Sequence, residues 1–176
     1  MTKFITDDVL EKVSKQRKKV LSIYFVILGV YLFICLGLLL WYWTLPYQSP
    51  TINTIKWICY PVTVVFVFVS FLYLNIPFKR VDRFYKMCYQ VINSNHDLYE
   101  GHFLNYDLTL QNKDGVDYKT LIFIEWNKYK KVNFERHVLV PYEMEFPQIP
   151  QKAKVRYYTQ ANVLCEYEIL STEENG

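Results

Sequence analysis

Two long runs of apolar residues dominate the first half of the chain. Residues 20–42 contain no charged side chain, and residues 55–77 contain only Lys56, at the start of the run. An α-helix rises about 1.5 Å per residue, so each run spans roughly 30 Å, the thickness of the hydrocarbon core of a bilayer. A core helix of a soluble protein is rarely apolar on all sides over this length. We therefore expect two transmembrane helices, over residues 20–43 and 55–78.

Aromatic residues mark the ends of the two runs that lie nearest each other in the sequence. Residues 41–43 are Trp, Tyr and Trp, and the second run begins with Trp57 and Tyr60. Such aromatic belts are typical of the membrane–water interface. The connection between the runs, residues 44–54, is short, uncharged and contains two prolines. A short connection makes the two helices antiparallel neighbours, so we expect a hairpin with an extracytoplasmic loop.

The charges beside the two runs predict the orientation of the hairpin. Residues 1–19 hold six Lys or Arg against three Asp or Glu, and residues 79–95 hold four against one. Positively charged flanks stay on the cytoplasmic side, which places both termini of this multi-pass protein in the cytoplasm. Basic side chains at this position attract the anionic headgroups of the bilayer. The expected headgroup contacts are Lys15, Arg17, Lys18, Lys19, Lys79, Arg80 and Arg83.

Helical patterns flank both runs. Residues 1–19 predict a cytoplasmic juxtamembrane helix with Thr6, Asp7 and Asp8 as candidate N-caps. Residues 79–96 predict a basic amphipathic helix, either a stalk that packs against the N-terminal helix or the β domain, or an interfacial sensor on the membrane. Its apolar positions are spaced by three and four: Val81, Phe84, Tyr85, Cys88, Val91 and Ile92.

The remainder of the chain alternates in the manner of β-strands. The turns between the strand patterns carry residues such as Asn, Asp and Gly. Five antiparallel strands in so short a segment predict a small barrel of the OB or SH3-like type over residues 97–170, folded without the helices, and a disordered tail over residues 171–176. The fold class is thus an α+β membrane protein. The expected strands are 98–111, 118–126, 132–140, 154–160 and 163–170.

The second of these strands is apolar on both faces. Leu121 and Phe123 alternate with Ile122 and Ile124. A strand of this kind is expected at the centre of the domain, with both isoleucines buried. We expect a charge at either isoleucine to unfold the barrel.

Motifs for catalysis, metals or cofactors do not occur in the sequence. It lacks a P-loop and the GxGxxG, HExxH, GxSxG and CxxC patterns. We therefore expect no enzyme activity, no cofactor and no metal. Residues 96–176 carry a net negative charge, which argues against nucleic acid as a partner. Cys35 and Cys59 are expected either as free thiols or as a disulfide.

The spans contain a few small or hydroxylated residues but no Asp, Glu or His. Transporters need ionisable groups in the membrane, so a monomeric transporter is not expected. Gly29 and Gly37 lie eight residues apart, and Thr63 and Ser70 lie seven apart. These pairs form either a packing seam for oligomerisation or a chance spacing.

The order of two spans followed by a small β domain resembles two known families. It resembles NfeD, short membrane-anchored OB-domain proteins that pair with stomatin-like scaffolds. It also resembles the two-span β-barrel effectors of bacterial cyclic-nucleotide defence systems. Both resemblances concern architecture, and they imply no site residues in this chain.

Two functions follow as hypotheses. The first is a membrane-tethered β-barrel adaptor that binds or regulates a membrane-associated protein in a homo- or hetero-oligomer. The second is a membrane-disrupting effector gated by a small-molecule ligand, for example a cyclic nucleotide, which oligomerises through its hairpin. The candidate interaction surface is the proline-rich loop after the third strand, with Tyr142, Met144 and Phe146. The alternative is a loop that only caps the barrel, with Phe146 and Ile149.

Overall fold

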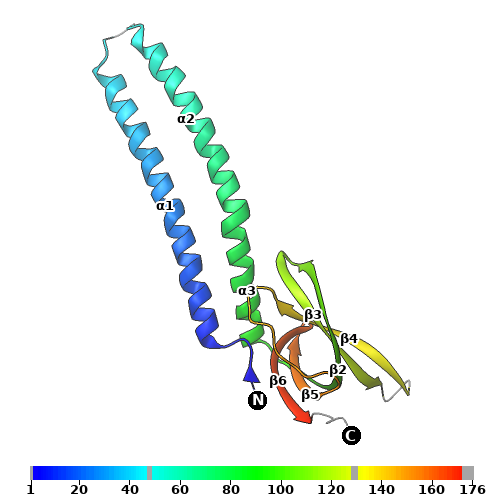
Figure 1. The fold of residues 1–176 in the computed structure, drawn as a ribbon. Helices are drawn as coiled ribbons and strands as arrows, with labels where there is room; N and C mark the ends of the chain where they lie inside the picture. The colour runs from blue at the N-terminus through cyan, green and yellow to red at the C-terminus, as the bar shows by residue number, and fades with distance from the viewer. Residues whose placement is uncertain (1, 47–48, 128–130, 172–176) are drawn as a thin grey trace. The chain divides into compact units, whose positions relative to one another are not determined.

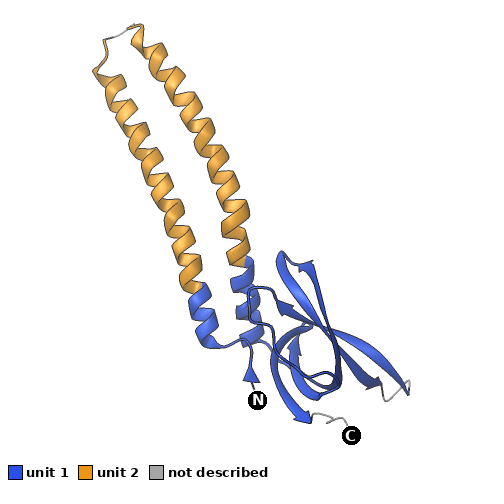
Figure 2. Ribbon diagram, in the orientation of Figure 1, with its two compact units in different colours: residues 1–13, 83–176 blue, residues 14–82 orange. Residues whose placement is uncertain are grey.

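The computed structural model describes residues 2–46, 49–127 and 131–171. These residues form two compact units. One consists of Met1–Val13 together with Arg83–Gly176, and the other is Ser14–Asp82 (Figure 2).

Long helices account for the first half of the chain (Figure 1). Helix α1 spans Asp7–Thr44, and α2 spans Thr51–Tyr73. A π-helical turn, Leu74–Phe78, leads from α2 into α3, Lys79–Asn93. This turn contains Pro77, which has no N–H to donate to a regular α-helical turn. Two of the helices are long and apolar enough to cross a membrane, as the sequence predicts.

The unit Ser14–Asp82 turns its apolar side chains outward. Phe33 is 80 % exposed and Val64 is 68 % exposed. Aromatic side chains make contacts between α1 and α2: the rings of Tyr31 and Phe66 stack with 3.9 Å between centroids. The hydroxyl of Tyr73 donates a hydrogen bond of 2.9 Å to the carbonyl of Val20. Large apolar side chains therefore make up much of the exposed surface of this unit.

Five strands close into a barrel, as the alternation predicts. The two halves of the long β2 pair with β3 and with β5, β3 pairs with β4, and β5 pairs with β6. One expectation is wrong: the pairing that closes the barrel, Leu139 of β4 with Val163 of β6, is parallel. The strand bounds are β2 Asp97–Lys113, β3 Val116–Asn127, β4 Val132–Pro141, β5 Lys154–Gln160 and β6 Val163–Ser171.

The N-terminus contributes a further strand that the sequence did not predict. Strand β1, Thr2–Lys3, pairs with β6. The amide of Phe4 continues the contact with a hydrogen bond of 2.8 Å to the carbonyl of Cys165. The start of the chain is thereby fixed to the barrel.

Strand β3 lies between two hydrophobic clusters. Leu121 and Phe123 face the barrel interior and are fully buried. On the other face, Val116 and Tyr118 belong to an outer cluster beneath α3. The strand therefore packs apolar side chains on both of its faces. Ile122 and Ile124 are only half-buried, so the expectation that they are core residues is wrong. The interior cluster contains Phe103, Leu121, Phe123, Val138, Val140, Ile149, Ala153, Val155, Tyr157 and Leu164.

The outer cluster joins α3 and the N-terminal segment to the barrel. Helix α3 contributes Phe84, Met87, Cys88 and Val91, which lie on one side of the helix. This is the packing that the apolar stripe of a stalk helix predicts. The N-terminal segment adds Ile5 and Val13, and the barrel adds Val116, Tyr118, Leu139, Val163 and Cys165.

Candidate binding hollow at the open end of the barrel

A hollow of about 580 Å³ lies where β2 and β3 separate. The ladder between these strands begins at the pair His102 and Ile124. Before His102, β2 pairs with β5, and after Ile124, β3 continues beside β4. The two strands therefore diverge, and space opens between them. The residues that line it are Leu98, Tyr99, Glu100, Gly101, His102, Ile124, Glu125, Trp126 and Lys154.

Gly101 lies at the point of divergence and permits the close approach of the two strands. A Cβ atom at this position would lie 2.9 Å from the carbonyl oxygen of Ile124 and 3.2 Å from Cγ of Glu125. The first of these contacts is with backbone, which cannot rotate away. A larger residue would therefore separate the strands and change the shape of the hollow.

Glu125 lines the hollow with a carboxylate that is almost fully buried. The residue is 6 % exposed. It accepts a hydrogen bond from the hydroxyl of Tyr157 and forms an ion pair of 2.8 Å with Nε of Arg136. The guanidinium of Arg136 lies 3.8 Å from the centre of the Tyr99 ring. These four residues come from β2, β3, β4 and β5, so the barrel itself brings them together.

The surroundings of this cluster shift the pKa of two groups. Burial, followed by the hydrogen bond and the charge of Glu125, raises the pKa of Tyr157. Burial by itself would lower the pKa of Arg136, but the hydrogen bond and charge of Glu125 outweigh it and the pKa is raised. The phenol of Tyr157 is therefore neutral and the guanidinium of Arg136 is charged at neutral pH.

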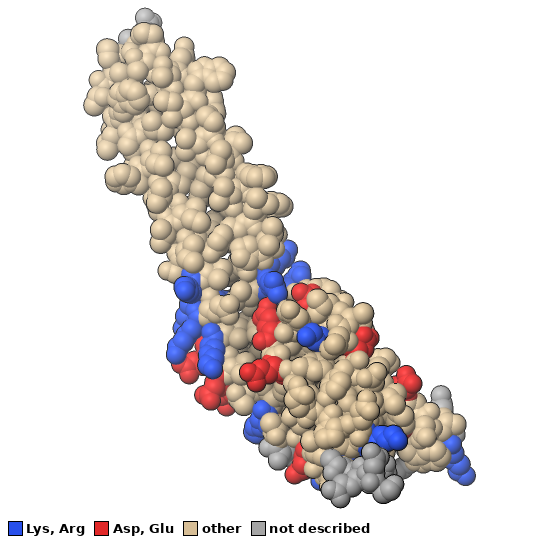
Figure 3. All heavy atoms as spheres, in the orientation of Figure 1, with Lys and Arg blue, Asp and Glu red and all other residues tan. Residues whose placement is uncertain are grey.

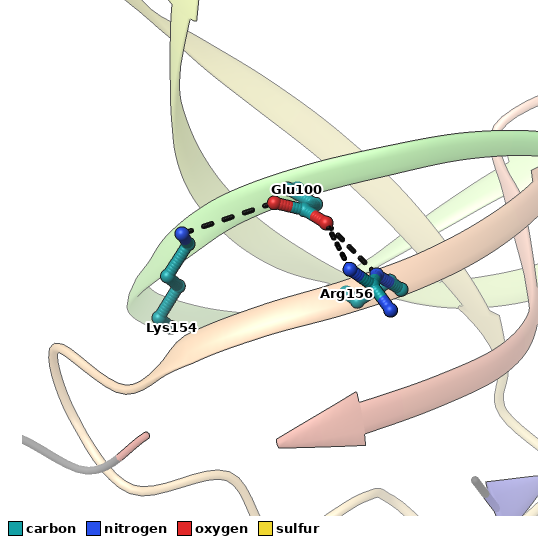
Figure 4. Close-up of polar contacts among 3 residues, drawn as sticks. All are labelled: Glu100, Lys154 and Arg156. Atoms are coloured by element: carbon teal, nitrogen blue, oxygen red, sulfur yellow. Dashed lines mark hydrogen bonds and ion pairs between the residues drawn. The ribbon is translucent and has the colours of Figure 1, made fainter. Parts of the chain in front are cut away.

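The rim of the hollow is exposed and mixed in character. Glu100 accepts hydrogen bonds of 2.8 and 2.7 Å from Nε and Nη2 of Arg156, and Nζ of Lys154 lies 3.8 Å from it (Figure 4). Leu98 and Trp126 add apolar surface, being 51 % and 58 % exposed. A ligand here would meet aromatic surface, an aliphatic side chain and groups of both charges.

Metal-ligand clusters and thiols are the remaining groups to place. Within the residues that the structure describes, no three His, Cys, Asp or Glu side chains are placed to hold a metal ion. Cys88 and Cys165 lie in the outer cluster, where burial raises the pKa of each thiol to about 12. Both are therefore protonated at neutral pH and poor nucleophiles. Cys35 and Cys59 are free, so the disulfide alternative does not hold in this structure.

The proline-rich loop is anchored to the barrel at two of its three candidate positions. The ring of Phe146 lies 5.1 Å from that of Tyr106 and packs on the interior cluster. The hydroxyl of Tyr106 donates to the carbonyl of Ile149 and accepts from its amide, each at 2.8 Å. Met144 packs on the outer cluster. Phe146 and Met144 thus cap the barrel, whereas Tyr142 is 49 % exposed.

The seven basic residues proposed for headgroups have different surroundings. Nε of Arg17 forms an ion pair of 2.8 Å with Asp82, and Nζ of Lys79 lies 3.2 Å from the side-chain oxygen of Asn75. In the other unit, Arg83 covers the turn at Gly115, which has a φ of +75°. The other four are Lys15, Lys18, Lys19 and Arg80. On the face shown in Figure 3, the apolar helices carry their Lys and Arg at one end.

The sequence-based prediction missed the hollow and its charged cluster. One signal was present: Glu125 interrupts an otherwise apolar strand core, and an acid among buried positions requires a partner. The identity of that partner, Arg136, depends on the register between β3 and β4.

Comparison of the chain with sequence models of protein families, with curated proteins and with solved structures finds no match. The function is therefore inferred from the residues and contacts of this chain.

Proposed function

We propose that this protein is a membrane-tethered binding module. Its hairpin crosses the membrane, both termini lie in the cytoplasm, and the barrel binds a membrane-associated partner. The outward-facing apolar side chains of Ser14–Asp82 support insertion, because water is a poor solvent for such a surface. The basic flanks support the orientation.

The barrel is of the OB type in this proposal, rather than SH3-like. The support is its strand order, in which the first barrel strand, β2, pairs with the second and fourth, and the third and fifth meet in parallel. OB barrels bind ligands on the face of their second and third strands, here β3 and β4. Helix α3 covers one end of this face, at Val116, Tyr118 and Leu139. A nucleic acid could use that end only by displacing α3, which favours a partner other than nucleic acid.

The hollow at Glu125 is the proposed binding surface, and it is the observation that carries the proposal. It reaches Trp126 of β3, which is about 26 Å along the strand from Tyr118 at the end that α3 covers, at about 3.3 Å per residue. A buried ion pair such as Glu125 with Arg136 adds little stability compared with apolar side chains of the same volume. Its presence beside an open hollow fits a role in recognition.

Photo-crosslinking of the full chain in its native membrane tests this proposal. A photoreactive residue at Trp126 is expected to give a discrete adduct, and Glu125→Gln is expected to remove it. Leu108 provides the matched control, because it is 63 % exposed on β2 and does not line the hollow. Equal adducts from positions 108 and 126, or adducts that survive Glu125→Gln, would contradict the assignment.

Labelling with a membrane-impermeant maleimide tests the orientation. Cys165 is a poor probe because it is only 2 % exposed, so exposed positions are needed. Pro46→Cys is expected to react in intact cells, and Glu135→Cys only after the cells are opened. The reverse pattern would overturn the cytoplasmic placement of the barrel.

The ligand-gated effector is the second candidate, and one observation favours it. Residues at the start of α1 and along α3 pack in the outer cluster with residues of the barrel. A ligand that moved the barrel strands would therefore also move these helical segments, which continue into the hairpin. Induced expression with membrane potential as the readout separates the two candidates. An adaptor leaves the potential unchanged, whereas an effector collapses it when its ligand is present.

A further inference from the structure

An apolar groove of about 400 Å³ runs between α1 and α2. It lies wholly within Ser14–Asp82. The stacked rings of Tyr31 and Phe66 hold the helices apart and form part of the groove, and the Tyr31 hydroxyl lies 3.3 Å from that of Thr63. The aliphatic walls are Ile27, Val30 and Ile34 of α1 and Val62, Val65 and Val69 of α2.

We propose that this groove binds an acyl chain of an anionic phospholipid from the cytoplasmic leaflet. The inference rests on the proposed insertion of the hairpin and is independent of what the barrel binds. A cavity of about 150 Å³ lined by leucine, isoleucine and phenylalanine side chains accepts benzene, so a groove of this volume has room for a longer hydrocarbon.

The charges at one end of the hairpin select the headgroup. Lys15, Arg17, Lys18, Lys19, Lys79 and Arg80 all belong to this unit, and Asp82 is the one carboxylate among its described residues. Val30 lies about 17 Å along α1 from Lys19, at about 1.5 Å per residue. One leaflet of hydrocarbon is about 15 Å deep. A lipid whose phosphate contacts Lys18 or Lys19 therefore places its chain beside Val30.

The shape of the groove favours a lipid chain over a helix of a second copy. Helices that associate in membranes use small residues, which let the backbones approach. The glycines of α1, Gly29 and Gly37, do not line the groove. A Cβ atom added at either glycine would meet nothing within 4 Å, so that surface remains open for a helix. The walls of the groove are β-branched or bulky, and a thin, flexible chain fits between them.

Native mass spectrometry of the full chain tests the proposal. The protein is reconstituted in nanodiscs of phosphatidylglycerol and phosphatidylcholine in equal amounts, released into detergent and weighed with its bound lipids. The wild type is expected to retain one phosphatidylglycerol per chain. Val30→Trp fills the groove and is expected to lower retention at least tenfold, whereas Val26→Trp, one turn away and outside the groove, retains the lipid. Lys18→Gln with Lys19→Gln is expected to keep a bound lipid but to lose the preference for phosphatidylglycerol at least fivefold.

The outcomes that overturn the proposal are distinct from those that overturn the binding module. Equal retention by Val30→Trp and Val26→Trp, or a wild type without bound lipid, refutes the lipid site. A wild-type dimer that Val30→Trp abolishes assigns the groove to a second copy instead. If Val30→Trp loses its helical circular dichroism, Val65→Phe on the opposite wall decides by the same criteria. Maleimide labelling of intact cells that express the same variants reports insertion separately, so a failed lipid site with an inserted hairpin leaves the binding module standing.

Discussion

The helical unit Ser14–Asp82 and the barrel place the same kinds of side chain in opposite environments. Phe33 and Phe68 of the helices are 80 % and 61 % exposed, whereas Phe103 and Phe123 of the barrel are 1 % and 0 % exposed. The barrel buries its apolar surface against itself, and the hydrophobic effect stabilises it in water. The helical unit leaves many of its large apolar side chains exposed, which is the surface that the proposed membrane insertion would cover. Residue type alone does not distinguish the two regions, whereas the period of the pattern does.

The junction of the two regions provides the largest test of this contrast. The strand pattern predicts that residues 97–170 fold by themselves, but the structure places α3 over one face of the barrel. Phe84, Met87 and Val91 are buried there, and burial of each side chain stabilises the fold by about 1.5–3 kcal/mol. We expect the free energy of unfolding of the fragment 97–171 to be roughly 5 kcal/mol lower than that of the fragment 79–171. We also expect the shorter fragment to aggregate, because its outer cluster is exposed. Denaturant titration of both fragments measures the difference, and equal midpoints would show that α3 is dispensable.

A matched pair of substitutions within one strand tests the assignment of the interior. Phe123→Ala removes a fully buried ring and is expected to destabilise the barrel by about 3–5 kcal/mol. Ile122→Ala, at the half-buried neighbouring position, is expected to have a clearly smaller effect. Thermal unfolding of the 79–171 fragment compares them. If Ile122→Ala were the more damaging change, the strand would face the other way.

The local sequence pattern predicted the helices and strands well, because apolar residues repeat at a different spacing in each kind of element. The ends of the five expected strands lie within two residues of the observed ends, and the apolar runs at residues 20–42 and 55–77 are helical. Strand β1 has two residues, too few to show alternation. The parallel closure joins Leu139 to Val163, and no nearby turn specifies that contact. The hollow was missed for a similar reason: it depends on where β2 leaves β3, which only the closed barrel determines.

The charged cluster at the hollow tests whether a buried pair stabilises the barrel. Arg136→Met leaves Glu125 buried without its counter-charge and is expected to cost about 3 kcal/mol. The double variant with Glu125→Leu is expected to recover most of that loss, since two apolar side chains replace the pair. Equilibrium unfolding of the single and double variants forms the cycle. A double variant as unstable as the single one would show that the pair itself holds the barrel together.

Alkaline pH provides a smaller and more gradual test of the outer cluster. Burial raises the pKa of Cys88, Tyr118 and Cys165 to about 12, from 9.0 for the thiols and 10.0 for the phenol. Above about pH 9 the unfolded chain releases protons that the folded chain retains, so the free energy of unfolding falls between pH 9 and 12. Denaturation midpoints at pH 8 and pH 10.5 measure this fall. Tyr118→Phe is expected to reduce it, and Tyr142→Phe, at an exposed position, to leave it unchanged.

The smallest expected effect belongs to the rim of the hollow, at Glu100. Its contact with Arg156, at 2.7 Å, is as short as that of Glu125 with Arg136, at 2.8 Å, but its side chain is 39 % exposed and that of Glu125 is 8 % exposed. Water screens an exposed pair, and such pairs contribute about 0–1 kcal/mol. Glu100→Gln is therefore expected to change the unfolding free energy of the 79–171 fragment by less than about 1 kcal/mol, while it weakens the crosslink from position 126 in the full chain. A loss as large as that of Arg136→Met, with the crosslink intact, would make the rim a structural part of the barrel and remove it from the binding surface.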